Sequence, residues 1–69
     1  MELSARNMLK GTVTDIKKGA IMAKVVIAIG SGLQVVSVVT VESVEELKLK
    51  VGDEAYAVIK STEVLLAKP

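Results

Sequence analysis

Apolar residues fill the middle of the chain almost without interruption, in two runs separated by a glycine turn. Residues 20–29 are apolar at every position except Lys24, and residues 33–41 are rich in valine. Between them lies Gly30-Ser31-Gly32. β-Branched residues favour strands, and a glycine turn between two such runs is typical of a hairpin. The pattern therefore predicts two antiparallel strands, one on each side of the turn.

Shorter extended segments flank this hairpin on both sides. A first strand is predicted at residues 9–16, where Gly11 indicates a bulge or a close approach of two backbones, and a polar turn at residues 17–19 ends it. Two further strands are predicted at residues 55–60 and 64–67, with a polar break between them. The chain therefore contains five predicted strands.

A short helix is expected between the third and fourth strands. Ser43 is followed three residues later by Glu46, which is the spacing of a capping box, and Val44 and Leu47 supply an apolar edge. The turn at residues 51–54 ends this segment. Ser43 is therefore the predicted N-cap of the helix.

The resulting order of elements, β-β-β-α-β-β, indicates an all-β fold. It suits a five-stranded OB-like barrel with one short helix between strands 3 and 4, formed by residues 1–69 as a single domain. A domain of this size buries only about 60% of its unfolded surface, and small folds add disulfides, a metal or oligomerisation. The chain has no cysteine and no histidine. We therefore expect it to be stabilised by oligomerisation.

Both faces of the central hairpin are apolar, which supports the same expectation. Strands with one face in solvent alternate apolar and polar residues, whereas strands covered on both faces do not. A small barrel with one short helix cannot cover both faces, so the second face is predicted to contact another copy of the chain. The alternative is that the surface simply tolerates several valines. The residues of this second face are Met22, Val26, Ala28, Val36 and Val38.

The composition argues against catalysis. Without histidine or cysteine the usual nucleophile–base pairs and zinc sites cannot be assembled, and we expect no metal coordinated directly by the protein. The acidic pairs Glu45-Glu46 and Asp53-Glu54 are adjacent residues in polar stretches, which is typical of solvated surfaces. The glycines at positions 30 and 32 are followed by a strand rather than a helix, unlike a nucleotide-binding loop. We therefore expect a protein that is not an enzyme.

Neither nucleic acid nor a membrane is an expected partner. OB-type surfaces that bind single strands combine aromatic stacking with a basic groove, whereas this chain has one aromatic residue, Tyr56, and a net charge of +1. Its apolar runs are far shorter than the roughly 20 residues of a membrane helix. The N-terminal residues 1–10 lack the apolar core of a signal peptide. A cytoplasmic location is therefore expected.

Two short polar clusters lie near opposite ends of the chain. Residues 4–7 precede the first strand, and residues 60–63 separate the last two. Each combines hydroxyls, a cation and turn N–H groups, which are the groups that a tetrahedral oxyanion needs. The alternative is that these residues only cap turns and face solvent. Composition alone leaves both interpretations open.

The order of residues in the two clusters indicates a family. SARNMLKG at residues 4–11 and KSTEV at residues 60–64, with VESVEELKLKVGDEAYAVIK between them, closely resemble the molbindin (Mop) family of small molybdate- and tungstate-binding proteins, which have TOBE-type domains. The resemblance covers essentially the whole chain. Molybdate and tungstate have nearly the same size and charge, so the sequence does not choose between them.

The resemblance implies an OB-like hexamer, a trimer of dimers, that stores molybdate or tungstate at subunit interfaces without an organic cofactor. By similarity, the oxyanion would contact Ser4, Arg6, Lys60 and Ser61, with contributions from Ala5 and Asn7 in the same loop. Thr40 and Ser43 match positions that complete the site from a neighbouring subunit, although Ser43 also fits a plain N-cap. A second oxyanion site is implied at Gly19, Ala20 and Ile21, where an ordinary turn is an equal alternative. The competing function is a structural or regulatory OB-type interaction module without oxyanion storage.

Overall fold

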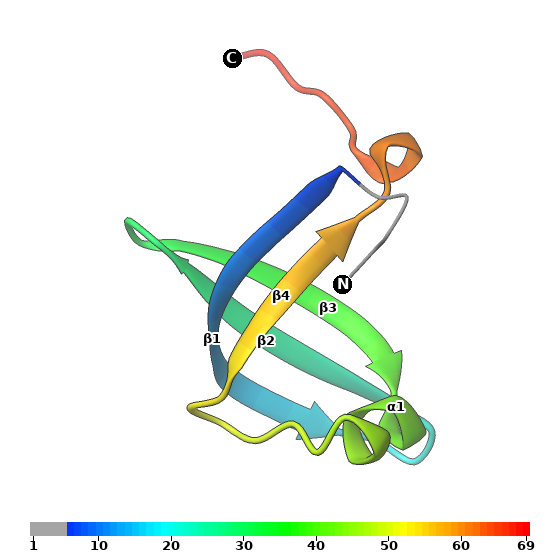
Figure 1. Ribbon diagram of the computed structural model, residues 1–69. Helices are drawn as coiled ribbons and strands as arrows, with labels where there is room; N and C mark the ends of the chain where they lie inside the picture. Colours follow the sequence, from blue (N-terminus) through cyan, green and yellow to red (C-terminus); the bar gives the residue numbers. More distant parts are fainter. Residues whose placement is uncertain (1–5) are drawn as a thin grey trace.

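The computed structural model describes residues 6–69, so the expected ligands Ser4 and Ala5 lie outside the described part of the chain. One antiparallel sheet curls around a small core, with strand order β3-β2-β1-β4 and a short helix at one end (Figure 1). The helix lies between β3 and β4, as in an OB-like barrel. The elements are β1 (Asn7–Lys18), β2 (Met22–Gly30), β3 (Leu33–Thr40), α1 (Val41–Glu46), β4 (Glu54–Ile59) and the 3-10 turn η1 (Ser61–Glu63).

The predicted central hairpin is confirmed. β2 and β3 pair antiparallel, with Val26 opposite Val36 and Gly30 opposite Leu33. Ser31 and Gly32 form the two-residue loop, and both have positive φ values, 54° and 76°. A positive φ at both central residues is the geometry of a type I′ turn, whose twist matches that of the flanking strands. This turn fixes the register of the hairpin.

The core lies on the concave side of the sheet and is closed at one end by α1. Val44 of the helix is 1% exposed and packs with the inward-facing residues of the strands. Gly11 marks the close approach predicted from the sequence, because a Cβ there would clash with the carbonyl oxygen of Ala28 and the side chain of Ile27. The buried core residues are Val13, Ala23, Val25, Ile27, Val44 and Ala57.

The helix begins earlier than the sequence predicted, and its N-cap is Thr40 rather than Ser43. Thr40 is extended (φ −72°, ψ 149°), and its side-chain oxygen accepts a hydrogen bond from the backbone N–H of Ser43. β3 continues as far as Thr40, which pairs with Met22, and the chain turns at once into the helix. The capping-box interpretation of Ser43 is therefore wrong. Within residues 6–69 no helix is long and apolar enough to cross a membrane.

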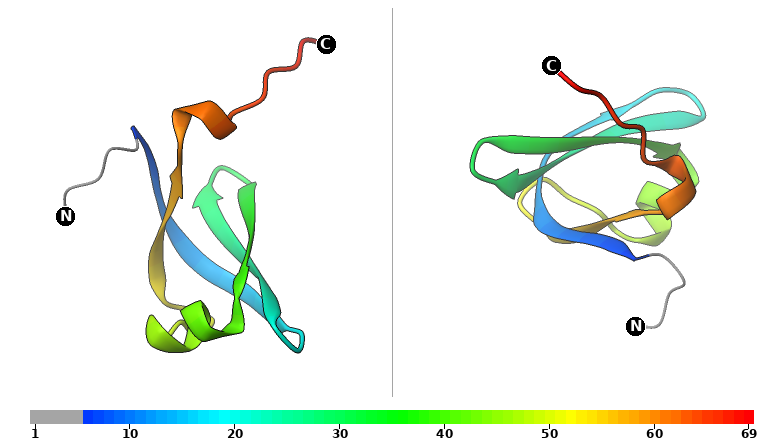
Figure 2. Two further views of the ribbon diagram at one scale, coloured as in Figure 1. Left: turned by 90° about the vertical axis from the view of Figure 1, so that its right-hand side faces the viewer. Right: turned by 90° about the horizontal axis from the view of Figure 1, so that it is seen from above.

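The described residues contain four strands rather than the expected five. The segment predicted as the fifth strand, residues 64–67, follows η1 without strand pairing. Leu65 and Leu66 are 92% and 94% exposed, and the segment points away from the sheet (Figures 1 and 2). No described strand pairs with this segment, so among residues 6–69 the expected five-stranded closure is not formed and β3 and β4 are the two edges of the sheet.

The outer face of the β2–β3 hairpin is mostly apolar, as the sequence pattern predicted, and it also carries Lys24 opposite Val38. Val36 and Val38 on β3 are 58% and 64% exposed, and Met22 on β2 is also exposed. Their inward neighbours Ala23 and Val25 are buried. The contrast shows that one chain buries the inner face of this hairpin and leaves Met22, Val36 and Val38 of the outer face exposed, with Val26 and Ala28 half-buried.

Candidate functional site

The pairing of β1 with β4 brings the two polar clusters of the sequence together. Asn7 at the start of β1 lies opposite Ile59 at the end of β4. The side-chain amide of Asn7 donates a hydrogen bond to the carbonyl oxygen of Ile59 (3.2 Å) across 52 positions of sequence. Arg6 directly precedes β1 and Lys60 directly follows β4, so both lie next to this pair at one end of the sheet. Sequence reasoning placed both clusters in a site but had no means of showing this adjacency.

This end of the sheet carries two cations, Arg6 and Lys60, that form no ion pair with a described carboxylate, although Glu63 lies in the turn that follows Lys60. Arg6, Lys60 and Ser61 are all exposed. Among residues 6–69 the only ion pair is Lys10–Glu54 (3.3 Å), further along β1 and β4. Two cations beside a hydroxyl offer charge-assisted hydrogen bonds, which are stronger than neutral ones. Arg6 and Lys60 are therefore suited to bind an anion.

Thr40 and Ser43 lie at the opposite end of the sheet, where β3 enters α1 (Figures 1 and 2). Thr40 Oγ1 donates to Ser43 Oγ (2.8 Å) and accepts from the Ser43 backbone N–H (3.0 Å). Each hydroxyl has one hydrogen to donate, and that of Thr40 is used within the pair. The hydroxyl hydrogen of Ser43 is therefore available for another acceptor.

The residues of the implied second site lie beside Thr40. Ala20 and Ile21 share with Thr40 a hollow of about 330 Å³, completed by Val41 and two carboxylates, Glu42 and Glu45. The backbone N–H of Gly19 donates to the Met22 carbonyl (2.7 Å), and that of Val41 donates to the Ile21 carbonyl (2.7 Å). The residues that line this hollow therefore include one hydroxyl, that of Thr40, and no cation. The negative charges of Glu42 and Glu45 would repel an anion.

The expected oxyanion ligands therefore form two groups at opposite ends of one chain. Arg6, Asn7, Lys60 and Ser61 form the cationic end, whereas Thr40 and Ser43 form the hydroxyl end together with the turn at residues 19–21. One copy does not bring the two groups together. A single site that uses both groups requires two copies. Within residues 6–69 no group of three or more acidic, histidine or cysteine side chains is placed to hold a metal ion.

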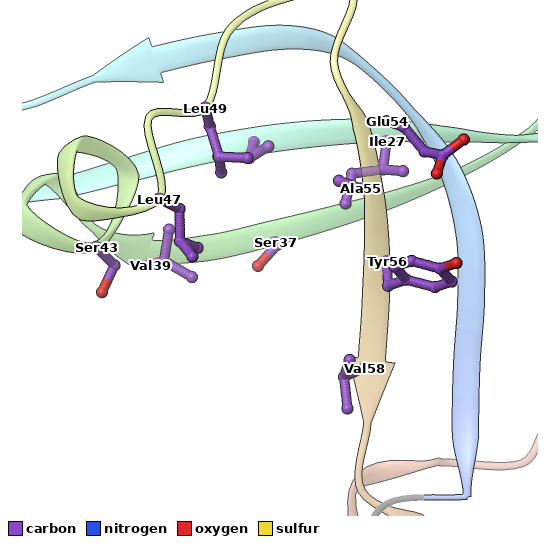
Figure 3. Close-up of a pocket in the computed structure, with 11 residues that line it drawn as sticks. Ile27, Ser37, Val39, Ser43, Leu47, Leu49, Glu54, Ala55, Tyr56 and Val58 are labelled. Atoms are coloured by element: carbon purple, nitrogen blue, oxygen red, sulfur yellow. The ribbon is translucent and has the colours of Figure 1, made fainter. Parts of the chain in front are cut away.

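Sequence reasoning missed a cleft that lies between the two edges of the sheet. It has a volume of about 400 Å³ and is lined by β2, β3 and β4, by Ser43 of α1 and by the loop that follows α1 (Figure 3). No local pattern indicates it, because it exists only where β3 and β4 face each other without pairing. Its lining residues are Val25, Ile27, Ser37, Val39, Ser43, Leu47, Leu49, Glu54, Ala55, Tyr56 and Val58.

Comparison with known proteins assigns the chain to a family. The TOBE domain model matches residues 3–66. The chain belongs to the TOBE domain family and, within it, to the molbindins (Mop). It is 52% identical over 66 residues to molybdenum-pterin-binding protein 1 of Clostridium pasteurianum, covering 96% of this chain and 97% of that protein.

Two solved molbindin-related structures have the same fold. MopII from Clostridium pasteurianum superposes with a TM-score of 0.91 at 46% identity, covering 97% of this chain and all of that one. The cytoplasmic molybdate-binding protein ModG, solved with molybdate bound, superposes with a TM-score of 0.95 at 49% identity. The match covers all of this chain and 49% of ModG, so this molbindin spans about half of the ModG chain.

Proposed function

We propose that this molbindin binds molybdate as an intact tetrahedral oxyanion. The observation that carries the proposal is the Asn7–Ile59 pairing, which places Arg6 and Lys60 next to the paired ends of β1 and β4 in a relative of ModG, a molybdate-binding protein. Molybdate carries two negative charges, and these two cations match them. Ser61, which follows Lys60, and Ser4 and Ala5, which precede Arg6 in the sequence, complete the proposed ligand set at this end.

The binding energy required is within reach of these groups. Affinities from micromolar to nanomolar correspond to about 8–12 kcal/mol. Charge-assisted hydrogen bonds contribute about 1.5–3 kcal/mol each and neutral ones about 1 kcal/mol. Two cations and about four hydroxyl or amide donors supply this sum, less the cost of ordering the side chains. A site held by paired strands keeps that ordering cost low.

The complete site lies between copies of the chain in this proposal. The hydroxyl end lacks a cation, and the cationic end needs further hydroxyl donors, so Thr40 and Ser43 of a neighbouring subunit complete the ligand set. The exposed outer face of Val36 and Val38 is buried in the same assembly. We propose a hexamer, a trimer of dimers, in which residues 1–69 act as one oxyanion-binding domain.

The proposal extends to tungstate, to storage and to a cytoplasmic location. Tungstate has the size and charge of molybdate, and ModG is a cytoplasmic protein. The role is reversible binding rather than catalysis, since the chain has no histidine or cysteine to form a nucleophile–base pair. No nucleic acid, membrane or organic cofactor takes part. The turn at Gly19, Ala20 and Ile21 forms a second oxyanion site only where another copy supplies the cation.

Titration calorimetry with molybdate, tungstate and sulfate tests the proposal. We expect micromolar or tighter binding of the first two and much weaker binding of sulfate, because a rigid cavity fits the smaller ion poorly. At a hundredfold excess over Kd, a bound ligand stabilises a protein by about 2.7 kcal/mol, so Tm should rise with molybdate more than with sulfate. Absence of molybdate heat and of any Tm shift would support the structural-module alternative. A bound pterin would appear as near-ultraviolet absorbance of the purified protein.

A further inference from the structure

Lys24 is a charged residue within the mostly apolar outer face of the β2–β3 hairpin. It is exposed and lies opposite Val38 on β3 and opposite Lys17 on β1. Its neighbours on the same face of β2 are Met22 and Val26, because every second residue of a strand faces the same side. Like charges directly opposite each other in a sheet are destabilising, and in the described part of the chain Lys24 forms no ion pair. Lys24 is therefore a charge without a partner on an apolar surface.

The proposed assembly of several copies limits what can cover this face. In that assembly the exposed side chains of Val36 and Val38 are buried against another copy, and Lys24 lies directly beside them. A lysine that loses its water without gaining a carboxylate strongly disfavours the contact. The surface that covers the outer face must therefore bring a carboxylate that is not already engaged.

Few carboxylates of the described chain are available for this role. Glu54 pairs with Lys10 (3.3 Å), and Asp53 Oδ2 accepts a hydrogen bond from the backbone N–H of Lys50 (2.9 Å). Glu63 belongs to the turn beside the cationic end of the sheet. The other described carboxylates are those of Asp15, Glu42, Glu45 and Glu46.

Glu42 and Glu45 differ from the other two because they share a hollow. With Thr40 and Ile21 they line the hollow of about 330 Å³, whose lining contains no cation. Two carboxylates in one hollow repel each other, and a cation placed between them removes this repulsion. Ile21 is 73% exposed and gives the hollow an apolar border. The hollow therefore matches Lys24 and its apolar surroundings in both charge and character.

We propose that Lys24 of one copy docks into the hollow between Glu42 and Glu45 of the next copy, an inference that rests on the assembly in the proposed function. Lys24 does not line the hollow of its own chain, so the contact forms between copies. The ammonium group has three donors for the two carboxylates, and its aliphatic stem packs against Ile21. A contact between two different surfaces closes into a ring where the rotation permits, and a ring of three is the trimer of the proposed hexamer.

Cross-linking of the natural protein with a carbodiimide tests this contact. The reagent condenses an ammonium group with a carboxylate that touches it, with loss of water, and leaves an amide without a spacer. Covalent dimers and trimers formed without molybdate are separated on a denaturing gel, and their joined peptides are identified by mass spectrometry. We expect Lys24 joined to Glu42 or Glu45 in clear excess over Lys17, which is also exposed. The Lys10–Glu54 pair should react within single chains and serves as the internal control.

Three results of this experiment overturn the docking. Lys24 joined only to Asp15 within monomers shows that the chain's own β1 supplies the carboxylate. Lys17 joined to α1 as often as Lys24 shows a reaction set by exposure alone. An oligomer, measured by light scattering, that gives the Lys10–Glu54 product but no Lys24 product between copies overturns this contact and leaves the proposed assembly intact. A monomeric natural protein overturns the assembly itself, so the two failures are distinguishable.

Charge reversal provides a second measurement with a matched control. Lys24→Glu and Glu45→Lys each place like charges in the contact, so each should raise the dissociation constant of the assembly, measured by light scattering on dilution, at least about tenfold. Both side chains are exposed, so each chain should still fold. Lys24→Glu/Glu45→Lys restores opposite charges and should recover the natural mass. Lys24→Glu/Glu46→Lys has the same net charge, but Glu46 does not line the hollow, so it should stay dissociated. Equal masses of the two double variants contradict the docking.

Discussion

The side-chain amide of Asn7 donates a hydrogen bond to the carbonyl oxygen of Ile59, at 3.2 Å, and thereby ties the start of β1 to the end of β4. Arg6 and Lys60 flank this bond. It holds together the two loops that carry the proposed molybdate ligands of one chain. Its removal should affect binding as well as folding, since one partly buried hydrogen bond contributes about 0.5–1.5 kcal/mol to stability.

Asn7→Ala is therefore expected to weaken molybdate binding about three- to tenfold, with a decrease in Tm of only a few degrees. Thr14→Val is the matched control, since it removes another side-chain bond to a backbone carbonyl, Thr14 Oγ1 to Val26 (3.4 Å), away from the site. Calorimetry and thermal melts measure the two effects. Equal affinities of Asn7→Ala and Thr14→Val would show that the Asn7 bond does not organise the site.

Arg6→Gln and Lys60→Gln should each reduce molybdate affinity about 10- to 100-fold, because each removes a charge-assisted hydrogen bond worth about 1.5–3 kcal/mol. Both side chains are exposed, so Tm in the absence of ligand should change little. Lys17→Gln, an exposed lysine on β1, controls for the general loss of positive charge. Unchanged affinity in both site variants, measured by calorimetry, would remove these cations from the ligand set.

Thr40 and Ser43, both in the proposed ligand set, should differ in their contribution to folding, because only Thr40 caps α1. Thr40→Val removes the N-cap acceptor of α1 and is expected to cost about 1 kcal/mol of unfolding free energy. Ser43→Ala keeps the backbone N–H that Thr40 caps and removes the hydroxyl hydrogen that is free to donate. It should leave urea unfolding almost unchanged and weaken molybdate binding several-fold. If Ser43→Ala binds molybdate as the wild type does, the site between copies does not use this hydroxyl.

Gly11→Ala should destabilise the fold by about 1–3 kcal/mol, since overpacking by one methyl group forces backbone shifts. The added Cβ would meet the Ala28 carbonyl oxygen and the Ile27 side chain, both within the crossing of β1 and β2. At Gly19 a Cβ would have one tight contact, 3.1 Å to the Met22 carbonyl oxygen, so Gly19→Ala should cost less. Urea unfolding measures the difference. A Gly11→Ala variant as stable as Gly19→Ala would refute the close approach.

The sequence by itself determined the local structure and the chemistry of the proposed site. Two apolar runs around Gly30-Ser31-Gly32 are sufficient for a hairpin, because the loop residues 31 and 32 accept the positive φ values that its twist requires. Gly11 indicated the close crossing of β1 and β2 for an equally local reason, the lack of a Cβ. The two polar clusters were recognised from their residues alone and are typical of molbindins.

Only the tertiary structure decided where these elements meet. The register of β1 on β4 joins clusters that are more than 50 positions apart, and the extent of β3 makes Thr40 rather than Ser43 the helix cap. The tertiary structure also leaves residues 64–67 outside the sheet and separates Thr40 and Ser43 from Arg6 and Lys60. These outcomes depend on non-local pairing, in which the free energy of a strand is set by its neighbours rather than by its own sequence. Propensity predicts a strand at residues 64–67, but no edge in the described sheet of a single chain receives it.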